Sequence, residues 1–306
     1  MNQSTFYSNG KLLLTGEYLV LDGAQALAIP TRFGQSLQVT PNNSNDALLW
    51  RSLAEDGSCW FETALTMDQI RKGQPADESD SVVATLINLL HQAYQLRPAC
   101  LDELAGSVVE TQLSFPREWG LGTSSTLVNN LGQWLQVNPY QLLKGTFGGS
   151  GYDIACAQTN SALLYQLQND DRTITPVHFD PIGKAQLYFV YLNRKQNSKS
   201  SIASYWSRRP LAHEWIPKID HITQNVLQNN DAQSMAEAFR QHEIWMSSLL
   251  ELPTAQELHF PDFEGIIKSL GAWGGDFVLA ISHENPTAYF AKKGFSTVIP
   301  YAEMAL

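Results

Sequence analysis

Charged residues, cysteine pairs and long apolar runs are scarce or missing in this chain. Of its 306 residues, 16% are charged and 43% are hydrophobic, a balance that excludes a disordered protein and predicts a substantial core. Because domains usually contain about 100–200 residues, this length predicts two domains or one large domain.

The missing cysteine and histidine patterns exclude two kinds of site. Cys59, Cys100 and Cys156 lie far apart and form no CxxC pair, so the sequence predicts no disulfide framework and favours a reducing, cytoplasmic location. The seven histidines include no HExxH motif and no Cys/His cluster, which excludes the usual zinc sites.

The charge and the hydropathy also limit the partners of the protein. A net charge of −10 argues against general binding to nucleic acid or to anionic membranes. No apolar run approaches the roughly 20 residues of a membrane span, and the stretch MNQSTFYSNGKLLL lacks the basic and apolar parts of a signal peptide. We therefore expect a monomer or homodimer that acts on a small molecule, without nucleic-acid or membrane partners.

The residue pattern predicts strands first and helices later. Short apolar runs broken by Gly, Pro, Asn and Asp predict strands in STFYSNG, EYLVLDG, ALAIP, QSLQVT, DALLWRS and CWFETAL. Apolar residues at helical spacing predict helices in DSVVATLINLLHQAYQL and after Gly122, and AGSVVETQLS between them predicts a strand. A helix at NPYQLL is expected to have Asn138 as its cap and Pro139 in its first turn.

The polar, turn-rich stretch QNDDRTITPVHFDPIG predicts a boundary between a first domain, residues 1–178, and a second domain, residues 179–306. Two amphipathic helices are expected at 211–229 and 231–250. The other elements expected around them are strand QLYFVYL, helix FEGIIKSL, turn GAWGG, strand DFVLAIS, helix PTAYFAKKG and strand STVIPY. Their sum is an α+β fold.

The stretch FPREWGLGTSST, Phe115–Thr126, is a glycine turn followed by small hydroxyl residues. It has no lysine, so it is not a P-loop, which needs GxxxxGK[ST]. Gly120 and Gly122 allow backbone N–H groups to approach a ligand, one of the hydroxyl residues can cap the next helix, and a helix N-terminus favours phosphate. An ordinary glycine turn with a serine cap is the alternative.

Three other segments hold candidate residues, each with an ordinary structural alternative. In SNGKLLLTGEYLVLDG, Lys11 stands where a strand begins and Glu17 stands among apolar residues, although a lysine there can simply be solvated. In GGSGYDIACA, Asp153 follows a glycine loop and starts a short helix, where it could be only an N-cap. The turn KSLGAWGGDF could be a simple C-cap and chain reversal.

Together and in this order, the segments resemble the GHMP kinases (galactokinase, homoserine kinase, mevalonate kinase and phosphomevalonate kinase). NGKLLLTGEY resembles the first motif of that family, PGKxxLxGEY/H; PREWGLGTSS resembles the second, PxxxGLGSSA; and Lys268–Gly275 resembles the third, Kx[ST]GAGGG. GSGYDIA is similar to the segment that carries the catalytic Asp, in the wording of one bacterial subgroup. The resemblance implies a two-domain GHMP kinase fold, with a ribosomal protein S5 domain 2-like first domain and a ferredoxin-like second domain.

The chain departs from the third motif at two positions. Leu270 replaces a Ser or Thr that could contact a ligand, and Trp273 replaces a glycine. In addition, the Glu that ligates magnesium in mevalonate kinases has no clear match between Gln141 and Asp153.

The resemblance implies an ATP- and Mg²⁺-dependent phosphotransferase. Asp153 would accept or orient the proton of the substrate hydroxyl, Lys11 would keep Asp153 ionised and offset phosphoryl charge, and Ser124 would bind Mg²⁺, which prefers oxygen. The ATP phosphates would lie on Gly120, Leu121, Gly122, Thr123, Ser124 and Ser125.

The expected acceptor is 5-phosphomevalonate of the mevalonate (isoprenoid) pathway, because GAWGGDF resembles the phosphomevalonate kinase version of the third motif. Residues 193–210 also contain five basic residues and no acid, which suits a phosphorylated, carboxylated substrate, although they could equally form a solvated basic loop. The expected substrate contacts are Glu17, Lys195, Lys199, Arg208, Gly271, Gly274, Gly275 and Asp276.

Other functions remain open on the same motifs. Mevalonate kinase, or a sugar or homoserine kinase, would need fewer basic contacts. A diphosphomevalonate decarboxylase-like lyase would also use ATP but would release CO₂. A family member that binds ligand without turnover is the alternative outside catalysis.

Overall fold

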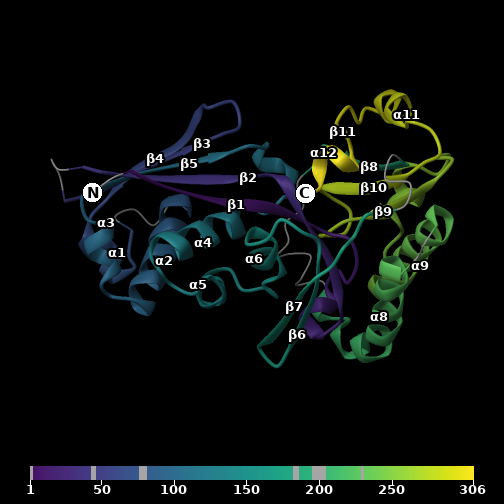
Figure 1. Ribbon diagram of the computed structural model, residues 1–306, viewed down its shortest axis with the longest axis horizontal. Coiled ribbons are helices and arrows are strands. Elements are labelled where there is room, and N and C mark those ends of the chain that lie inside the picture. Colours follow the sequence, from purple (N-terminus) through teal and green to yellow (C-terminus); the bar gives the residue numbers. More distant parts are fainter. Residues whose placement is uncertain (1–2, 43–45, 76–80, 182–185, 195–204, 229–230) are drawn as a thin grey trace. The chain divides into compact units, whose positions relative to one another are not determined.

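The computed structural model describes residues 3–42, 46–75, 81–181, 186–194, 205–228 and 231–306 (Figure 1). Packing divides the chain into two compact units. The first comprises Met1–Gly10, Phe33–Arg117 and Gly122–Gln158, and the second comprises Lys11–Arg32, Glu118–Leu121 and Thr159–Leu306. The domain boundary expected at residue 178 stays a prediction, since packing groups residues 159–178 with the second unit.

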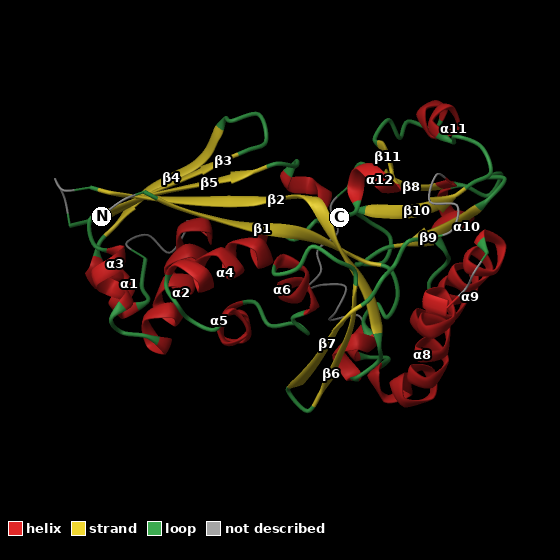
Figure 2. Cartoon of the chain, viewed as in Figure 1, coloured by secondary structure: helices red, strands yellow, loops and turns green. Residues whose placement is uncertain are grey.

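The first unit is a sheet with helices on one of its faces (Figure 2). Its strands are β1 (Ser4–Leu13), β2 (Ala26–Pro41), β3 (Leu48–Leu53), β4 (Cys59–Leu65) and β5 (Ser107–Leu113), of which β1 and β2 also give residues to the second unit. Its helices are α1 (Met67–Lys72), α2 (Ser81–Leu96), α3 (Cys100–Leu104), α4 (Thr123–Trp134), α5 (Pro139–Thr146) and α6 (Tyr152–Ala157), and the short η2 (Arg117–Trp119) extends from this unit into the second.

The strand order β4-β3-β5-β2 places one apolar face of this sheet against the helices. β3 and β5 run parallel because α1–α3 return the chain between them, whereas β3–β4 and β2–β5 are antiparallel. Alternate residues of β5 are buried, and its Val109 packs with Trp50 of β3, Leu90 of α2 and Leu131 of α4 in one core. The sequence therefore predicts correctly strands β1, β3, β4 and β5 and helices α2, α4, α5 and α6 of this unit, whereas α1 and α3 are not predicted.

The second unit contains a four-stranded antiparallel sheet of order β11-β8-β10-β9. The chain order β8, α8–α9, β9, β10, α11, β11 is the ferredoxin-like arrangement that the resemblance implies. The elements are η1 (Leu19–Asp22), β6 (Leu163–Gln168), β7 (Asp171–Pro176), β8 (Leu187–Tyr191), η4 (Arg209–Leu211), α8 (Ala212–Gln228), α9 (Ala232–Leu250), α10 (Ala255–His259), β9 (Ile266–Ser269), β10 (Phe277–Ile281), α11 (Thr287–Lys292), β11 (Val298–Pro300) and α12 (Tyr301–Met304).

The helix expected in FEGIIKSL is wrong, since Ile266–Ser269 forms strand β9 and pairs with β10. Phe263, Ile267 and Leu270 have the spacing of a helical stripe and therefore predict a helix. In the structure, however, every residue of strand β9, Ile266–Ser269, is buried. A strand that is buried on both faces shows no polar alternation, so a short apolar run cannot distinguish it from a helix.

Two strand predictions near the N-terminus also need correction. EYLVLDG forms a tight turn and the 3-10 helix η1 rather than a strand, and ALAIP and QSLQVT belong to one continuous strand, β2. The first part of β2 pairs with β6 and the later part with β5, and these partners keep the strand extended past Pro30.

The α+β fold class is confirmed by these two sheets and their helices. Every helix in the described part of the chain is too short or too polar to span a bilayer.

Candidate active site

Helix α4 begins directly after the glycine turn of the second motif. Gly122 is its N-cap in a left-handed conformation (φ 98°), and no described side chain caps the helix. The expected serine or threonine cap is therefore wrong: the Ser125 hydroxyl donates instead to the Gly122 carbonyl at 2.9 Å. No side chain in the described part of the chain caps the first N–H groups of α4, and an anion can bind such groups at a helix N-terminus.

A buried polar network, which the sequence patterns do not predict, holds α4 against β1 and β2. The Asn129 side-chain amide donates to the Ser8 hydroxyl at 2.8 Å, and the Ser8 hydroxyl donates to the side-chain oxygen Oδ1 of Asn130 at 2.7 Å. The Asn130 amide and the Thr126 hydroxyl both donate to Gln35, at 2.9 and 2.8 Å. Because every bond is buried, the network fixes the start of α4 relative to these strands.

Asp153 lies in the first turn of α6, behind another left-handed glycine, Gly151 (φ 90°). Gly151 takes the N-cap position, and the half-buried Asp153 accepts a hydrogen bond from the Ile154 N–H at 3.0 Å. Helices α4 and α6 pack together, and both are in the first unit. A carboxylate in this first turn is stabilised by the helix dipole.

Lys11 binds the second-motif loop within the second unit. Its ammonium group donates to the Gly120 carbonyl at 2.8 Å, and its backbone N–H donates to the Leu121 carbonyl at 2.9 Å. Gly120 has φ +67°, and a Cβ there would lie 2.3 Å from the carboxylate of Asp276. Three residues thus meet at this place: Lys11 of the first motif, Gly120 of the second, and Asp276, which directly follows the third.

The third motif is the turn between β9 and β10. Gly271 and Gly274 are left-handed (φ +66° and +82°), Gly275 donates to the Ala272 carbonyl, and Asp276 also has positive φ (53°). The departure at Trp273 has a structural reason, because the side chain is buried and its indole N–H donates to the Pro253 carbonyl at 3.1 Å. Leu270, the other departure, is buried as well.

Glu17 of the first motif is buried and ion-paired. Its carboxylate accepts a hydrogen bond from Lys268 at 2.5 Å, and His242 Nε2 lies 3.2 Å from its second oxygen. Burial raises the pKa of Glu17, although the positive charge of Lys268 acts in the opposite direction. Burial and, to a lesser extent, the charge of Lys268 lower the pKa of His242 well below its usual value. The substrate contact expected for Glu17 stays a prediction, and this ion pair argues for a role in holding the loop.

Tyr18, the next residue, has an unusual backbone conformation, φ 60° and ψ −50°. The Leu19 N–H donates to the Glu17 carbonyl at 2.6 Å, which closes a γ-turn of the rarer, strained form. Such strain costs on the order of 1–3 kcal/mol and persists where surrounding contacts enforce it.

No protein-family model matches the sequence, and no curated protein matches it. Solved structures do match. The mevalonate kinase of Methanococcus jannaschii has a TM-score of 0.72 over 97% of both chains at 13% identity. The phosphomevalonate kinase of Streptococcus pneumoniae, in complex with phosphomevalonate and AMPPNP, has a TM-score of 0.65 over 95% of this chain and 97% of that chain at 18% identity. The galactokinase of Lactococcus lactis, with galactose, has a TM-score of 0.68 over 95% and 88% at 13% identity.

The fold is that of the GHMP kinases. At these low identities the likeness establishes the fold alone. The activity has to be argued from the residues that this GHMP kinase fold brings together.

The basic segment of this GHMP kinase fold is less free than its sequence indicates. Arg208 forms a two-pronged ion pair with Glu251, and Arg209 Nε donates to Asp22 at 2.5 Å. Arg194 lies at the third-motif turn, where its backbone carbonyl accepts from the Asp276 N–H at 3.0 Å and its Nη2 lies 3.2 Å from His259 Nε2. The other two expected phosphate contacts, Lys195 and Lys199, lie outside the described residues.

The residues at the start of α4 and α6 fit a magnesium ion. The Ser124 hydroxyl is exposed, and no described residue hydrogen-bonds to it. Mg²⁺ prefers oxygen ligands and usually takes one or two from the protein, with water and phosphate oxygens completing its shell. Ser124 and Asp153 offer such oxygens, while the described part of the chain contains no cluster of three or more His, Cys, Asp or Glu side chains.

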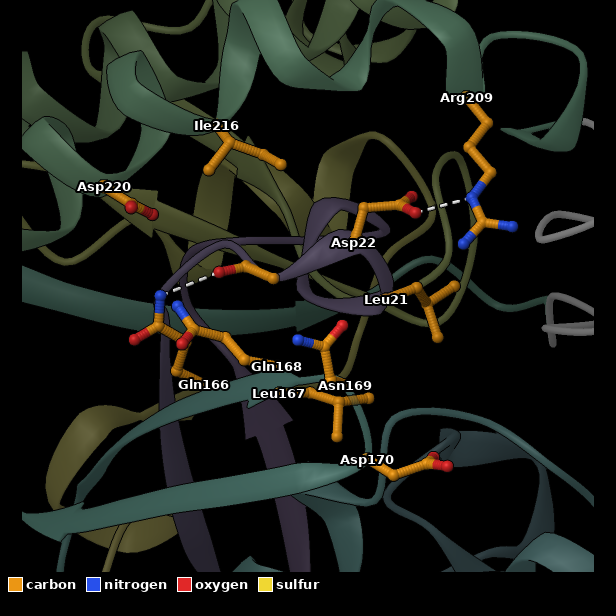
Figure 3. A pocket seen from close by; sticks show the side chains of 11 residues that line it. Leu21, Asp22, Gln166, Leu167, Gln168, Asn169, Asp170, Arg209, Ile216 and Asp220 are labelled. Carbon is orange, nitrogen blue, oxygen red and sulfur yellow. Dashed lines mark hydrogen bonds and ion pairs between the residues drawn. The ribbon is translucent and has the colours of Figure 1, made fainter.

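A separate cavity of about 800 Å³ lies in the second unit (Figure 3). Asp22 lies on the wall of this cavity beside Arg209 (Figure 3). None of the predicted site residues that the structure describes lines the cavity. Its lining residues are Leu21, Asp22, Gly23, Gln166, Leu167, Gln168, Asn169, Asp170, Arg209, Ile216 and Asp220.

Proposed function

We propose that this protein is an ATP-dependent small-molecule kinase that transfers the γ-phosphoryl group to a hydroxyl group. The observation that carries the proposal is the meeting of Lys11, Gly120 and Asp276, which joins the three motifs in one place. The uncapped start of α4 supports it, since backbone N–H groups there can bind the ATP phosphates without a P-loop lysine.

Each proposed residue has a physical role in the transfer. Asp153 accepts or orients the proton of the attacking hydroxyl, and the Lys11 ammonium offsets charge on the transferred phosphoryl group. Mg²⁺ bound with ATP would neutralise charge on the phosphates, and Ser124 is the residue proposed to hold it. Phosphoryl transfer depends mainly on positioning and charge stabilisation, which this set supplies.

We further propose a phosphorylated acid, 5-phosphomevalonate, as the acceptor. The support is Arg194, which lies at the third-motif turn and which no described carboxylate neutralises. The ion pairs of Arg208 and Arg209 weaken the case, because they occupy two of the five basic groups. Those pairs favour an acceptor with fewer charges, such as mevalonate or a sugar, as the second candidate.

The test is ADP release with a panel of acceptors: 5-phosphomevalonate, mevalonate, galactose and homoserine. CO₂ and phosphate release from diphosphomevalonate is measured in parallel, because that result would indicate a lyase. We expect Asp153→Asn to lower ADP release by orders of magnitude with little loss of stability, since the amide keeps the shape and loses the charge. No ADP release with any acceptor would contradict the proposal.

A further inference from the structure

The first motif contacts two points of the hairpin that carries the third motif, one in strand β9 and one at the tip of the turn. Before the turn, Lys268 of β9 pairs with Glu17. At the tip of the turn, the backbone N–H of Trp273 donates to the Tyr18 hydroxyl at 2.8 Å. Two adjacent residues of one motif thus bind two separate points of the other.

The turn needs such contacts because its backbone is intrinsically free. Gly271 and Gly274 have positive φ, and a Cβ at Gly271 would meet no atom within 4 Å. Glycine has the widest conformational freedom, so neither residue restricts the turn by itself. Trp273 lies between them, with a buried side chain in place of the glycine of the GHMP motif.

Tyr18 and the two residues before it are each held by a contact with the rest of the second unit. The Tyr18 ring stacks on Tyr205 with centroids 5.5 Å apart, the Gly16 N–H donates to His242 at 3.0 Å, and Glu17 is bound to Lys268. These contacts enforce the strained γ-turn, and the γ-turn directs the Tyr18 hydroxyl to Trp273. Strain of this kind is kept where a side chain must occupy one position.

We propose that Tyr18 and Trp273 are positioning residues, which hold the turn Gly271–Asp276 in the conformation that binds the phosphoryl acceptor. This inference rests on the proposed kinase function. Trp273 is then an adaptation of this chain: it replaces the freedom of a glycine with a buried side chain and a fixed backbone hydrogen bond.

Tyr18→Phe and Tyr205→Phe make a matched pair of variants. Each variant removes one hydroxyl and keeps the stacked ring. Tyr205→Phe is the control because the Tyr205 hydroxyl donates to Asp22, at 2.6 Å, and not to the third-motif turn. We expect Tyr18→Phe to raise the acceptor KM about tenfold, corresponding to about 1.4 kcal/mol, with little change in kcat or in the KM for ATP. Tyr205→Phe should leave the acceptor KM unchanged. Equal effects of the two variants, or none from Tyr18→Phe, would overturn the inference.

Hydrogen exchange tests the same contact without any turnover. We expect the Trp273 amide to exchange about tenfold faster in Tyr18→Phe than in the wild type or in Tyr205→Phe, following the same free-energy scale. If the wild type transfers no phosphoryl group but this exchange pattern holds, the proposed function fails and the holding of the turn stands. If the Trp273 amide is equally protected in all three proteins, the positioning role is refuted whatever the activity.

Discussion

The buried Lys268–Glu17 pair should have a large effect on stability. Both groups are buried, so Lys268→Met leaves an uncompensated carboxylate and should destabilise the protein by about 3–5 kcal/mol in urea unfolding. The double variant with Glu17→Gln should recover much of that loss. Lys293→Met is the control, because its exposed pair with Asp262 contributes about 1 kcal/mol or less. A double variant no more stable than Lys268→Met would contradict this account.

His242 should make stability depend on pH. Burial and then Lys268 lower its pKa well below 6.5, so the unfolded chain takes up this proton first as the pH falls. The stability that this lowered pKa gives is therefore complete above pH 6.5. Below pH 6.5 the free energy of unfolding falls by up to about 1.4 kcal/mol per pH unit. The measurement is the free energy of unfolding between neutral and mildly acidic pH.

His242→Gln isolates this effect, because glutamine can still accept from the Gly16 N–H but does not titrate. The raised pKa of Glu17 acts in the opposite direction, since stability from that group falls as the pH rises. The difference between wild type and variant therefore reports His242, and the exposed His213→Gln is the matched control. Parallel curves for wild type and His242→Gln would refute the prediction.

Arg194 should contribute to acceptor affinity if the acceptor carries a phosphate. Its guanidinium group lies 3.7 Å from the position of a Cβ at Gly274. Arg194→Met should raise the KM for 5-phosphomevalonate about tenfold or more, since a charge-assisted hydrogen bond contributes about 1.5–3 kcal/mol. Arg240→Met, on the exposed surface of α9, should change nothing. A wild type that prefers unphosphorylated mevalonate would exclude this acceptor.

A single substitution at the start of α4 distinguishes a capping role of Ser124 from a metal-binding role. Gly122 is the N-cap, so Ser124→Ala removes no cap and should change stability by no more than about 0.5 kcal/mol. The same variant should raise the Mg²⁺ concentration needed for half-maximal turnover. Ser125→Ala is the neighbouring control, since that hydroxyl is bound to Gly122. A Ser124→Ala protein with unchanged magnesium dependence would remove Ser124 from the metal site.

Nucleotide binding should stabilise the folded protein against unfolding. Mg·AMPPNP at a hundred times its Kd should add about 2.7 kcal/mol to the free energy of unfolding, because it binds only the folded chain. Asp153→Asn should keep this stabilisation while losing turnover, which separates binding from chemistry. If AMPPNP does not raise the melting temperature of the wild type, the ATP-binding proposal is wrong.

Local sequence alone determined the elements whose signals are complete within a short window. The helical spacing in α2, α8 and α9, the Asn138–Pro139 start of α5, and the order of the glycine motifs are all of this kind. Periodicity and capping act over three or four residues, so the local sequence contains the information that determines these elements. The motif order likewise predicted the GHMP kinase fold.

Which side chains meet depends on the three-dimensional fold. Arg209 pairs with Asp22 at a separation of 187 residues, and Lys268 pairs with Glu17 at 251. No local pattern distinguishes a lysine bound to such a partner from a solvated one. The same holds for β9, which is a strand because β10 lies beside it, and for the buried polar network, in which Asn129 has a partner at Ser8. Long-range contacts supply the hydrogen bonds and the burial that choose among conformations the local sequence leaves open.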